Sequence, residues 1–211
     1  MVYKKNFKSF ANHLRNNFLI YFILVLIFVL GNIIGPLLLK GLKYDTRKLL
    51  LRLSNPYFKS ISFINFSNNM VFRNSLMNNL LLLLVLTVSS FFSVGVFLIP
   101  FAIFFKGLTI GLMVGYLVSN FGFKGFLISI LGILPQNIFL ICGLIGFGAL
   151  CMSYAIGHKN QGGRLVVNTP NSTAYKYVNL SFFYVFLIAI STLIEGYFSP
   201  IFLRFVLRYY I

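Results

Sequence analysis

Residues 18–39 read FLIYFILVLIFVLGNIIGPLLL, a run of 22 residues without a charged side chain. A membrane hydrocarbon core of about 30 Å is crossed by about 20 helical residues, each rising about 1.5 Å. The run is therefore long enough for a transmembrane helix. It is too long for the apolar part of a signal peptide and lacks a small-residue cleavage site, so we expect it to persist as the first helix.

Four further stretches of the chain lack Lys and Arg, and the last of them contains one acid, Glu195. They lie between Arg73 and Lys106, Lys106 and Lys124, Lys124 and His158, and Lys176 and Arg204. We predict an all-α polytopic membrane bundle, a single membrane domain over residues 1–211, with five transmembrane helices. The expected helices span about 18–39, 80–103, 107–123, 126–157 and 177–203. The third has only 17 residues, about 25 Å, and we expect a short full crossing because a re-entrant hairpin would bury Lys124 at its tip.

The composition excludes a water-soluble domain. Of the 211 residues, 59% are hydrophobic and 9% are charged, against about 25% charged in soluble domains. The net charge is +16. Basic residues are scattered over the loops and tails rather than gathered in one stripe, which argues against nucleic acid as a partner. Anionic lipid headgroups are the simpler counter-charge.

Two polar segments flank the first helix. Residues 1–17 place apolar and basic side chains on different helical faces, which indicates either an amphipathic helix on anionic lipid or a simple topogenic flank. The largest polar loop, residues 40–75, carries seven Lys and Arg. Its Asn-rich continuation, residues 62–79, could form an interfacial helix or a docking surface, although genome composition explains any single Asn as well.

The distribution of basic residues does not decide the orientation. With these five spans, the side of the N-terminus carries 8 Lys and Arg and the opposite side carries 10. The positive-inside rule needs a larger difference.

Residues with catalytic potential are scarce. The only acids are Asp45 and Glu195, and the only histidines, His13 and His158, are far apart in sequence. No zinc-protease or nucleophile-elbow motif occurs. We interpret Cys142 and Cys151 as small apolar residues rather than a disulfide or metal pair. We therefore predict no enzyme, no catalytic or metal-binding residue and no cofactor.

Three polar residues at membrane depth are candidate functional residues. Pro135-Gln136-Asn137 interrupts an apolar run, so the helix either kinks there or begins anew at Pro135. The amides of Gln136 and Asn137 need partners, and hydrogen bonds between helices are favoured over a transport site. Glu195 is an intramembrane acid, which is either functional or paired with Lys106, Lys124 or an amide.

Gly107, Gly111 and Gly115 lie on one stripe of the third expected helix. Such a stripe allows a neighbouring backbone to approach closely. Gly31 and Gly35 repeat the spacing in the first helix. We expect the partner to be another helix of the same chain rather than a second copy.

Several ordered motifs resemble the stage II sporulation protein M family. The motifs are Phe72–Asn79, Lys106-Gly107 with Gly111 and Gly115, Phe123-Lys124-Gly125-Phe126, Leu134-Pro135-Gln136-Asn137 and Glu195-Gly196-Tyr197-Phe198-Ser199-Pro200. The similarity extends over nearly the whole chain in order. The lack of Trp and the scarcity of acids depart from the usual pattern.

The resemblance implies a multi-pass protein in the mother-cell membrane of an endospore-forming bacterium, at the sporulation septum. It implies a non-catalytic scaffold that anchors two cell-wall-degrading partners, stage II sporulation proteins D and P, during engulfment of the forespore. It also favours a cytoplasmic N-terminus with the loop 40–75 facing the wall. The alternatives are a transporter or flippase using Glu195 with Gln136 and Asn137, and, less favoured by the residue inventory, an intramembrane enzyme.

Overall fold

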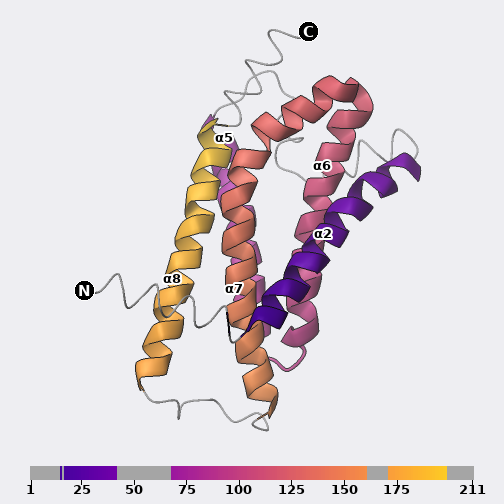
Figure 1. Cartoon of the computed structure of the whole chain (residues 1–211). Helices are drawn as coiled ribbons and strands as arrows, with labels where there is room; N and C mark the ends of the chain where they lie inside the picture. Colours follow the sequence, from indigo (N-terminus) through magenta and orange to yellow (C-terminus); the bar gives the residue numbers. More distant parts are fainter. Residues whose placement is uncertain (1–14, 16, 42–67, 161–170, 199–211) are drawn as a thin grey trace.

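The protein is a bundle of long helices in a computed structural model (Figure 1). The structure describes Arg15, Asn17 to Gly41, and residues 68–160 and 171–198. In chain order the helices are α2 (Phe18–Gly41), α5 (Asn68–Ser90), α6 (Gly95–Gly132), α7 (Leu134–Asn160), α8 (Asn171–Leu193) and the π-helix η1 (Ile194–Phe198). The described residues contain no strand, so the predicted all-α class is confirmed.

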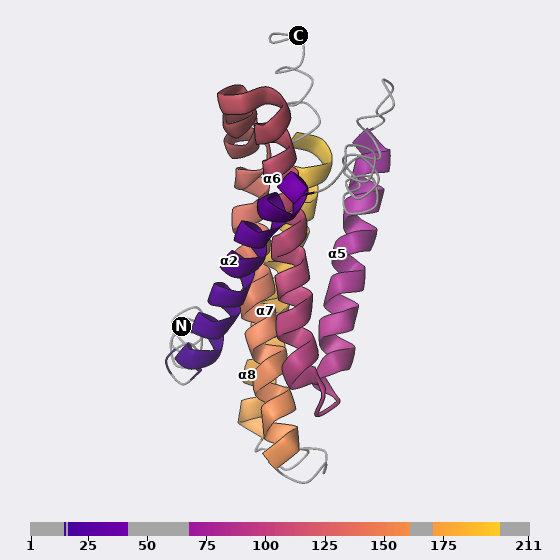
Figure 2. The same cartoon turned by 90° about the vertical axis from the view of Figure 1, so that its right-hand side faces the viewer.

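Five of these helices are long and apolar enough to cross a membrane, as predicted. The spans are Phe18–Gly41, Val71–Ser90, Gly95–Ser119, Leu134–Gly157 and Val178–Phe198. Successive spans run in opposite directions, and the long axis of the bundle is nearly vertical in Figures 1 and 2. α7 is the central helix: 67% of its span is buried inside the protein, against 22% for α2 and α5.

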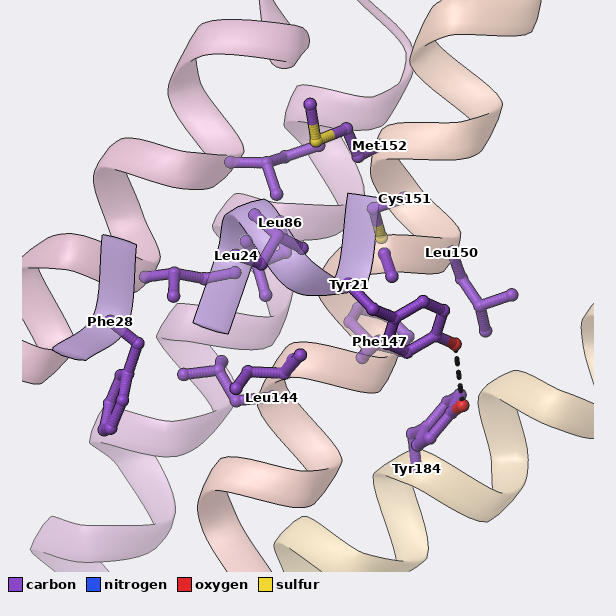
Figure 3. Packing of buried hydrophobic residues seen from close by; sticks show 14 of the residues in the cluster. Tyr21, Leu24, Phe28, Leu86, Leu144, Phe147, Leu150, Cys151, Met152 and Tyr184 are labelled. Atoms are coloured by element: carbon purple, nitrogen blue, oxygen red, sulfur yellow. Dashed lines mark hydrogen bonds between the residues drawn. The ribbon is translucent and has the colours of Figure 1, made fainter. Parts of the chain in front are cut away.

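The core is made of apolar side chains from all five helices. Leu24, Leu86 and Leu144, from α2, α5 and α7, are fully buried in one cluster. At its edge the Tyr21 and Tyr184 hydroxyls share a hydrogen bond of 2.9 Å, which joins α2 to α8 (Figure 3). Many large apolar side chains instead face outward, among them Phe101 and Phe186. This exposure fits a surface surrounded by lipid rather than water.

The glycines of α6 pack against α2 within the same chain. A Cβ at Gly35 would lie 2.6 Å from the Leu112 nitrogen and 2.7 Å from the Leu108 oxygen. From the other side, a Cβ at Gly107 or Gly111 would collide with the carbonyl oxygen of Phe28 or Asn32, and one at Gly115 would lie 2.8 Å from the Pro36 Cα. The two stripes therefore set the close crossing of α2 and α6.

The boundaries of the second and third helices differ from the expected 80–103 and 107–123. α5 begins at Asn68 and ends at Ser90, a short turn follows, and α6 begins at Gly95. We expected Lys106 to lie in the loop between these two helices, but it lies inside α6. The true turn contains no charge and is marked only by Ser and Gly. There the Phe92 and Gly95 backbones are hydrogen-bonded, and a Cβ at Gly95 would collide with the Ser89 carbonyl.

The fourth helix also begins later than the expected 126–157. The backbone of α6 breaks at Gly122, with φ 57° and ψ −133°, and then continues as a short helix to Gly132. α7 starts at Leu134, so Pro135 lies in its first turn, where the missing N–H costs nothing. Of the two alternatives at Pro135, the structure therefore has a new helix.

Other expected segments lie largely outside the described residues. They are the amphipathic segment 1–17, most of the loop 40–75, and residues beyond Phe198 in the expected fifth helix 177–203. The Asn-rich end of that loop is described from Asn68 onward, where it forms the first turns of α5.

Candidate intramembrane polar site

Polar side chains from four helices gather inside the bundle. Seven of them are buried: Ser75, Asn79, Gln136, Asn137, Ser191, Thr192 and Glu195. Half-buried Lys106 joins this group from α6. A polar group in hydrocarbon must find a partner inside the protein, because no water is available to replace it.

Lys106 lies at the middle of the α6 span. It is eleven residues after Gly95 and thirteen before Ser119, about 16 Å and 20 Å along the helix. Its Nζ donates to the Asn79 Oδ1 at 3.4 Å. An ammonium at this depth is costly unless it is paired, so Lys106 needs partners within the bundle.

A chain of hydrogen bonds continues from Asn79 into α8. Asn79 Nδ2 donates to Thr192 Oγ1 at 3.0 Å, and Thr192 Oγ1 donates to the Ile188 carbonyl at 2.8 Å. Each group therefore accepts from one neighbour and donates to the next. The hydrogen-bonded side chains of Lys106, Asn79 and Thr192 therefore join α6, α5 and α8.

Glu195 supplies the opposite charge. It is 8% exposed and lies in η1, close enough to Lys106 for its carboxylate to act electrostatically on the ammonium. The π-helical turn directs both Glu195 and Gly196 into the protein. Short π-helical segments occur frequently at functional sites. Of the partners considered from the sequence, Lys106 is thus near Glu195.

Two contacts fix how α5 is aligned with α8 and η1, one before Glu195 in the sequence and one after it. A Cβ at Gly196 would lie 2.7 Å from the Phe72 Cβ, and the Phe72 and Tyr197 rings are 5.5 Å apart. One and two turns further along α5 come Ser75 and then Asn79, which contacts Thr192. Ser75 therefore lies at the level of Glu195. Its Oγ is buried and has no hydrogen-bond partner among the described residues.

Gln136 and Asn137 lie in the first turn of α7, nearer the membrane surface. Asn137 Nδ2 donates to the Ile133 carbonyl at 2.8 Å, four residues earlier in the chain. Ser191 Oγ donates to the Gln136 carbonyl at 2.8 Å and so links α7 to α8 one turn before Glu195. Gln136 is thus close to the Glu195 helix, whereas the Asn137 contact is local.

Four contributors to this site, namely Ser75, Asn79, Ser191 and Thr192, were not selected from the sequence. Their signal is helical spacing. Ser75 and Asn79 are four residues apart, and Thr192 precedes Glu195 by three, so each pair lies on one face of its helix. Such neutral pairs are not conspicuous in an apolar run, because they carry no charge.

Groups suited to catalysis or metal binding are sparse in the described part of the chain. No group of three or more His, Cys, Asp or Glu side chains there could hold a metal ion. Cys142 faces outward and Cys151 is buried, and both are free thiols. The chemistry that this site can perform is the pairing of charges and amides between helices.

Five apolar spans around a buried polar site define a polytopic α-helical membrane protein. The family model of stage II sporulation protein M matches residues 7–200, nearly the whole chain, and the chain belongs to that family. It is thus a sporulation-related membrane protein. Comparison with the curated proteins and with the solved structures gave no match.

Proposed function

We propose that the protein is a non-catalytic membrane scaffold that anchors peptidoglycan-degrading enzymes during engulfment of the forespore. The observation that carries the proposal is the family match over residues 7–200. The polar site supports it, because Lys106, Asn79 and Thr192 bond to one another and so hold helices together. The expected partners are hydrolases resembling stage II sporulation proteins D and P.

In this proposal the partners bind the segment between α2 and α5 in the mother-cell membrane at the septum. Residues 42–67 carry five of the chain's 18 Lys and Arg. The proposed orientation puts this segment outside the cell and the N-terminus in the cytoplasm. The high basic charge of the segment runs against the positive-inside rule, so the orientation needs its own test.

Affinity capture from sporulating cells tests the partner. The tagged protein is isolated in mild detergent, and the bound proteins are identified by mass spectrometry. In the test variant, residues 42–67 become a neutral linker of equal length, while α5 from Asn68 onward is kept because Ser75 and Asn79 are buried. The control replaces residues 161–170, between α7 and α8, in the same way. Loss of hydrolases in the first variant alone supports the scaffold, and absence of hydrolases from the intact protein contradicts it.

Cysteine labelling in intact cells tests the orientation. Ser54→Cys and Asn168→Cys place one new thiol on each side of the membrane, because three crossings, those of α5, α6 and α7, separate residue 54 from residue 168. The native Cys142 and Cys151 lie within the α7 span. A membrane-impermeant thiol reagent should label the first variant and not the second. The reverse pattern refutes an external partner-binding segment.

A second candidate is a transporter or flippase that uses Glu195 with Gln136 and Asn137. The observation in its favour is that Glu195 is buried and acts electrostatically on Lys106, since charged residues within membrane spans often mark transport pathways. Glu195→Gln separates the candidates. A proton carrier should lose sporulation activity at normal abundance, whereas a scaffold that tolerates the neutral amide should still capture its partners.

A further inference from the structure

The polypeptide between the third and fourth spans forms a bent segment at one end of the bundle. We call residues 120–133 the elbow. Its backbone breaks at Gly122 and then forms a helix to Gly132 before α7 begins. In Figure 1 the salmon-coloured part of the chain rises to the top of the bundle, bends there and descends into α7.

The elbow lies at the level of one membrane surface. From Gly95 to Gly122 there are 27 helical steps, about 40 Å along the axis. That length exceeds the hydrocarbon core of about 30 Å and approaches the full bilayer thickness of about 40–45 Å. The short helix after Gly122 therefore starts among the headgroups and leads back toward the hydrocarbon.

The inward face of the short helix is fixed to the bundle. Gly125 and Ser129 are buried, and a Cβ at Gly125 would collide with the Leu117 carbonyl. Ser129 Oγ donates to the Gly125 carbonyl at 2.8 Å, so its hydroxyl is satisfied within the helix. The elbow cannot rotate without separating this contact with α6.

The outward face is apolar and large. Phe123 is 74% exposed, and Phe126 and Leu127 are also exposed. The Phe123 and Phe126 rings lie 6.3 Å apart, so they form one aromatic patch. The single charge within residues 107–157 is Lys124, beside this patch. Exposure of two Phe rings and a Leu to water is unfavourable, whereas the boundary between headgroups and acyl chains suits them, with the Lys ammonium at phosphate level.

We propose that the elbow is a lipid-docking surface that inserts Phe123, Phe126 and Leu127 into one leaflet, with Lys124 at the phosphates of its headgroups. The occupant is the lipid of that leaflet, because the patch combines apolar rings with one flanking cation at membrane-surface depth. This surface is separate from residues 42–67 and does not depend on the proposed scaffold function.

Tryptophan fluorescence tests the proposal, since the chain contains no Trp. The Phe123→Trp variant of the full chain is reconstituted into vesicles whose phospholipids carry bromine either near the headgroup or near the chain end. Phe186→Trp is the matched control, because Phe186 is exposed and lies near the middle of the α8 span. We expect shallow bromines to quench the first variant more strongly, and deep bromines to quench the control more strongly.

Two results overturn the proposal. One is an emission spectrum typical of water with no bromine quenching, which places the patch in solvent. The other is an apolar emission spectrum without quenching, which means that protein covers the patch. If Phe123→Trp does not accumulate, Phe126→Trp provides the same readout from the second ring.

Discussion

Asn79 and Thr192, 113 positions apart in the chain, are joined by a hydrogen bond of 3.0 Å inside the membrane-spanning bundle. The same Asn79 accepts from Lys106, so one amide connects three helices. This relationship makes α5 an integral part of the bundle although only 22% of its span is buried.

Thr192→Val should destabilise the protein by roughly 0.6–1.7 kcal/mol, the range measured for hydrogen bonds between membrane helices. The substitution keeps the side-chain shape and removes the acceptor for Asn79 Nδ2. The free energy of unfolding in detergent micelles measures the effect. Thr87→Val is the control, because exposed Thr87 bonds only to the Leu83 carbonyl of its own helix. Equal effects of the two substitutions would contradict a role for the link to Asn79.

Lys106→Met should destabilise the bundle by about 3–5 kcal/mol, because it leaves the buried Glu195 carboxylate without its opposite charge. The combined Lys106→Met and Glu195→Gln variant should recover most of that loss. Folded protein in the membrane fraction and unfolding in micelles give the double-mutant cycle. Additive effects of the two substitutions would mean that the charges do not interact.

Gly111→Val should separate α2 from α6, since the Asn32 carbonyl occupies the space that a Cβ needs. Overpacking of this kind costs about 1–3 kcal/mol, and here the obstacle is backbone. Gly157→Val is the control, because nothing lies within 4 Å of a Cβ there. Unfolding in micelles compares the two. The prediction fails if both variants are equally stable.

Tyr21→Phe should cost about 1 kcal/mol, since it leaves the Tyr184 hydroxyl buried without this partner. The Tyr21→Phe and Tyr184→Phe double variant should be less destabilised than the sum of the single variants, because both polar atoms are then removed. Thermal unfolding of the four proteins measures the coupling. A coupling of zero would show that the hydroxyls act independently.

The sequence was sufficient to predict the class of fold and the number of spans. Apolar length decides both, because about 20 predominantly apolar residues are needed for a helix to cross the hydrocarbon core. The sequence was less informative about boundaries. Lys106 looked like the end of a helix, yet a cation that is hydrogen-bonded to Asn79 and lies close to Glu195 can be accommodated at mid-membrane. The real turn after Ser90 carries no charge.

The candidate site was only partly predictable. Glu195 was selected because an acid within an apolar run is conspicuous. Asn79 was not, since Asn is common throughout this chain and its burial depends on contacts with Thr192 and Lys106, both distant in sequence. Asn137 shows the opposite case, in which a conspicuous amide bonds to the nearby Ile133 carbonyl.

The helices on either side of residues 42–67 are attached to the bundle by different kinds of contact. α2 lies backbone to backbone on α6 through its glycines, and α5 is fixed by side-chain hydrogen bonds at Asn79 and by the contact of Phe72 with Gly196. A tensile load applied to the segment would be shared unequally. The contacts of α2 are distributed along its glycine stripe, whereas force applied through α5 would reach the contact of Phe72 with Gly196 before the hydrogen bonds of Asn79.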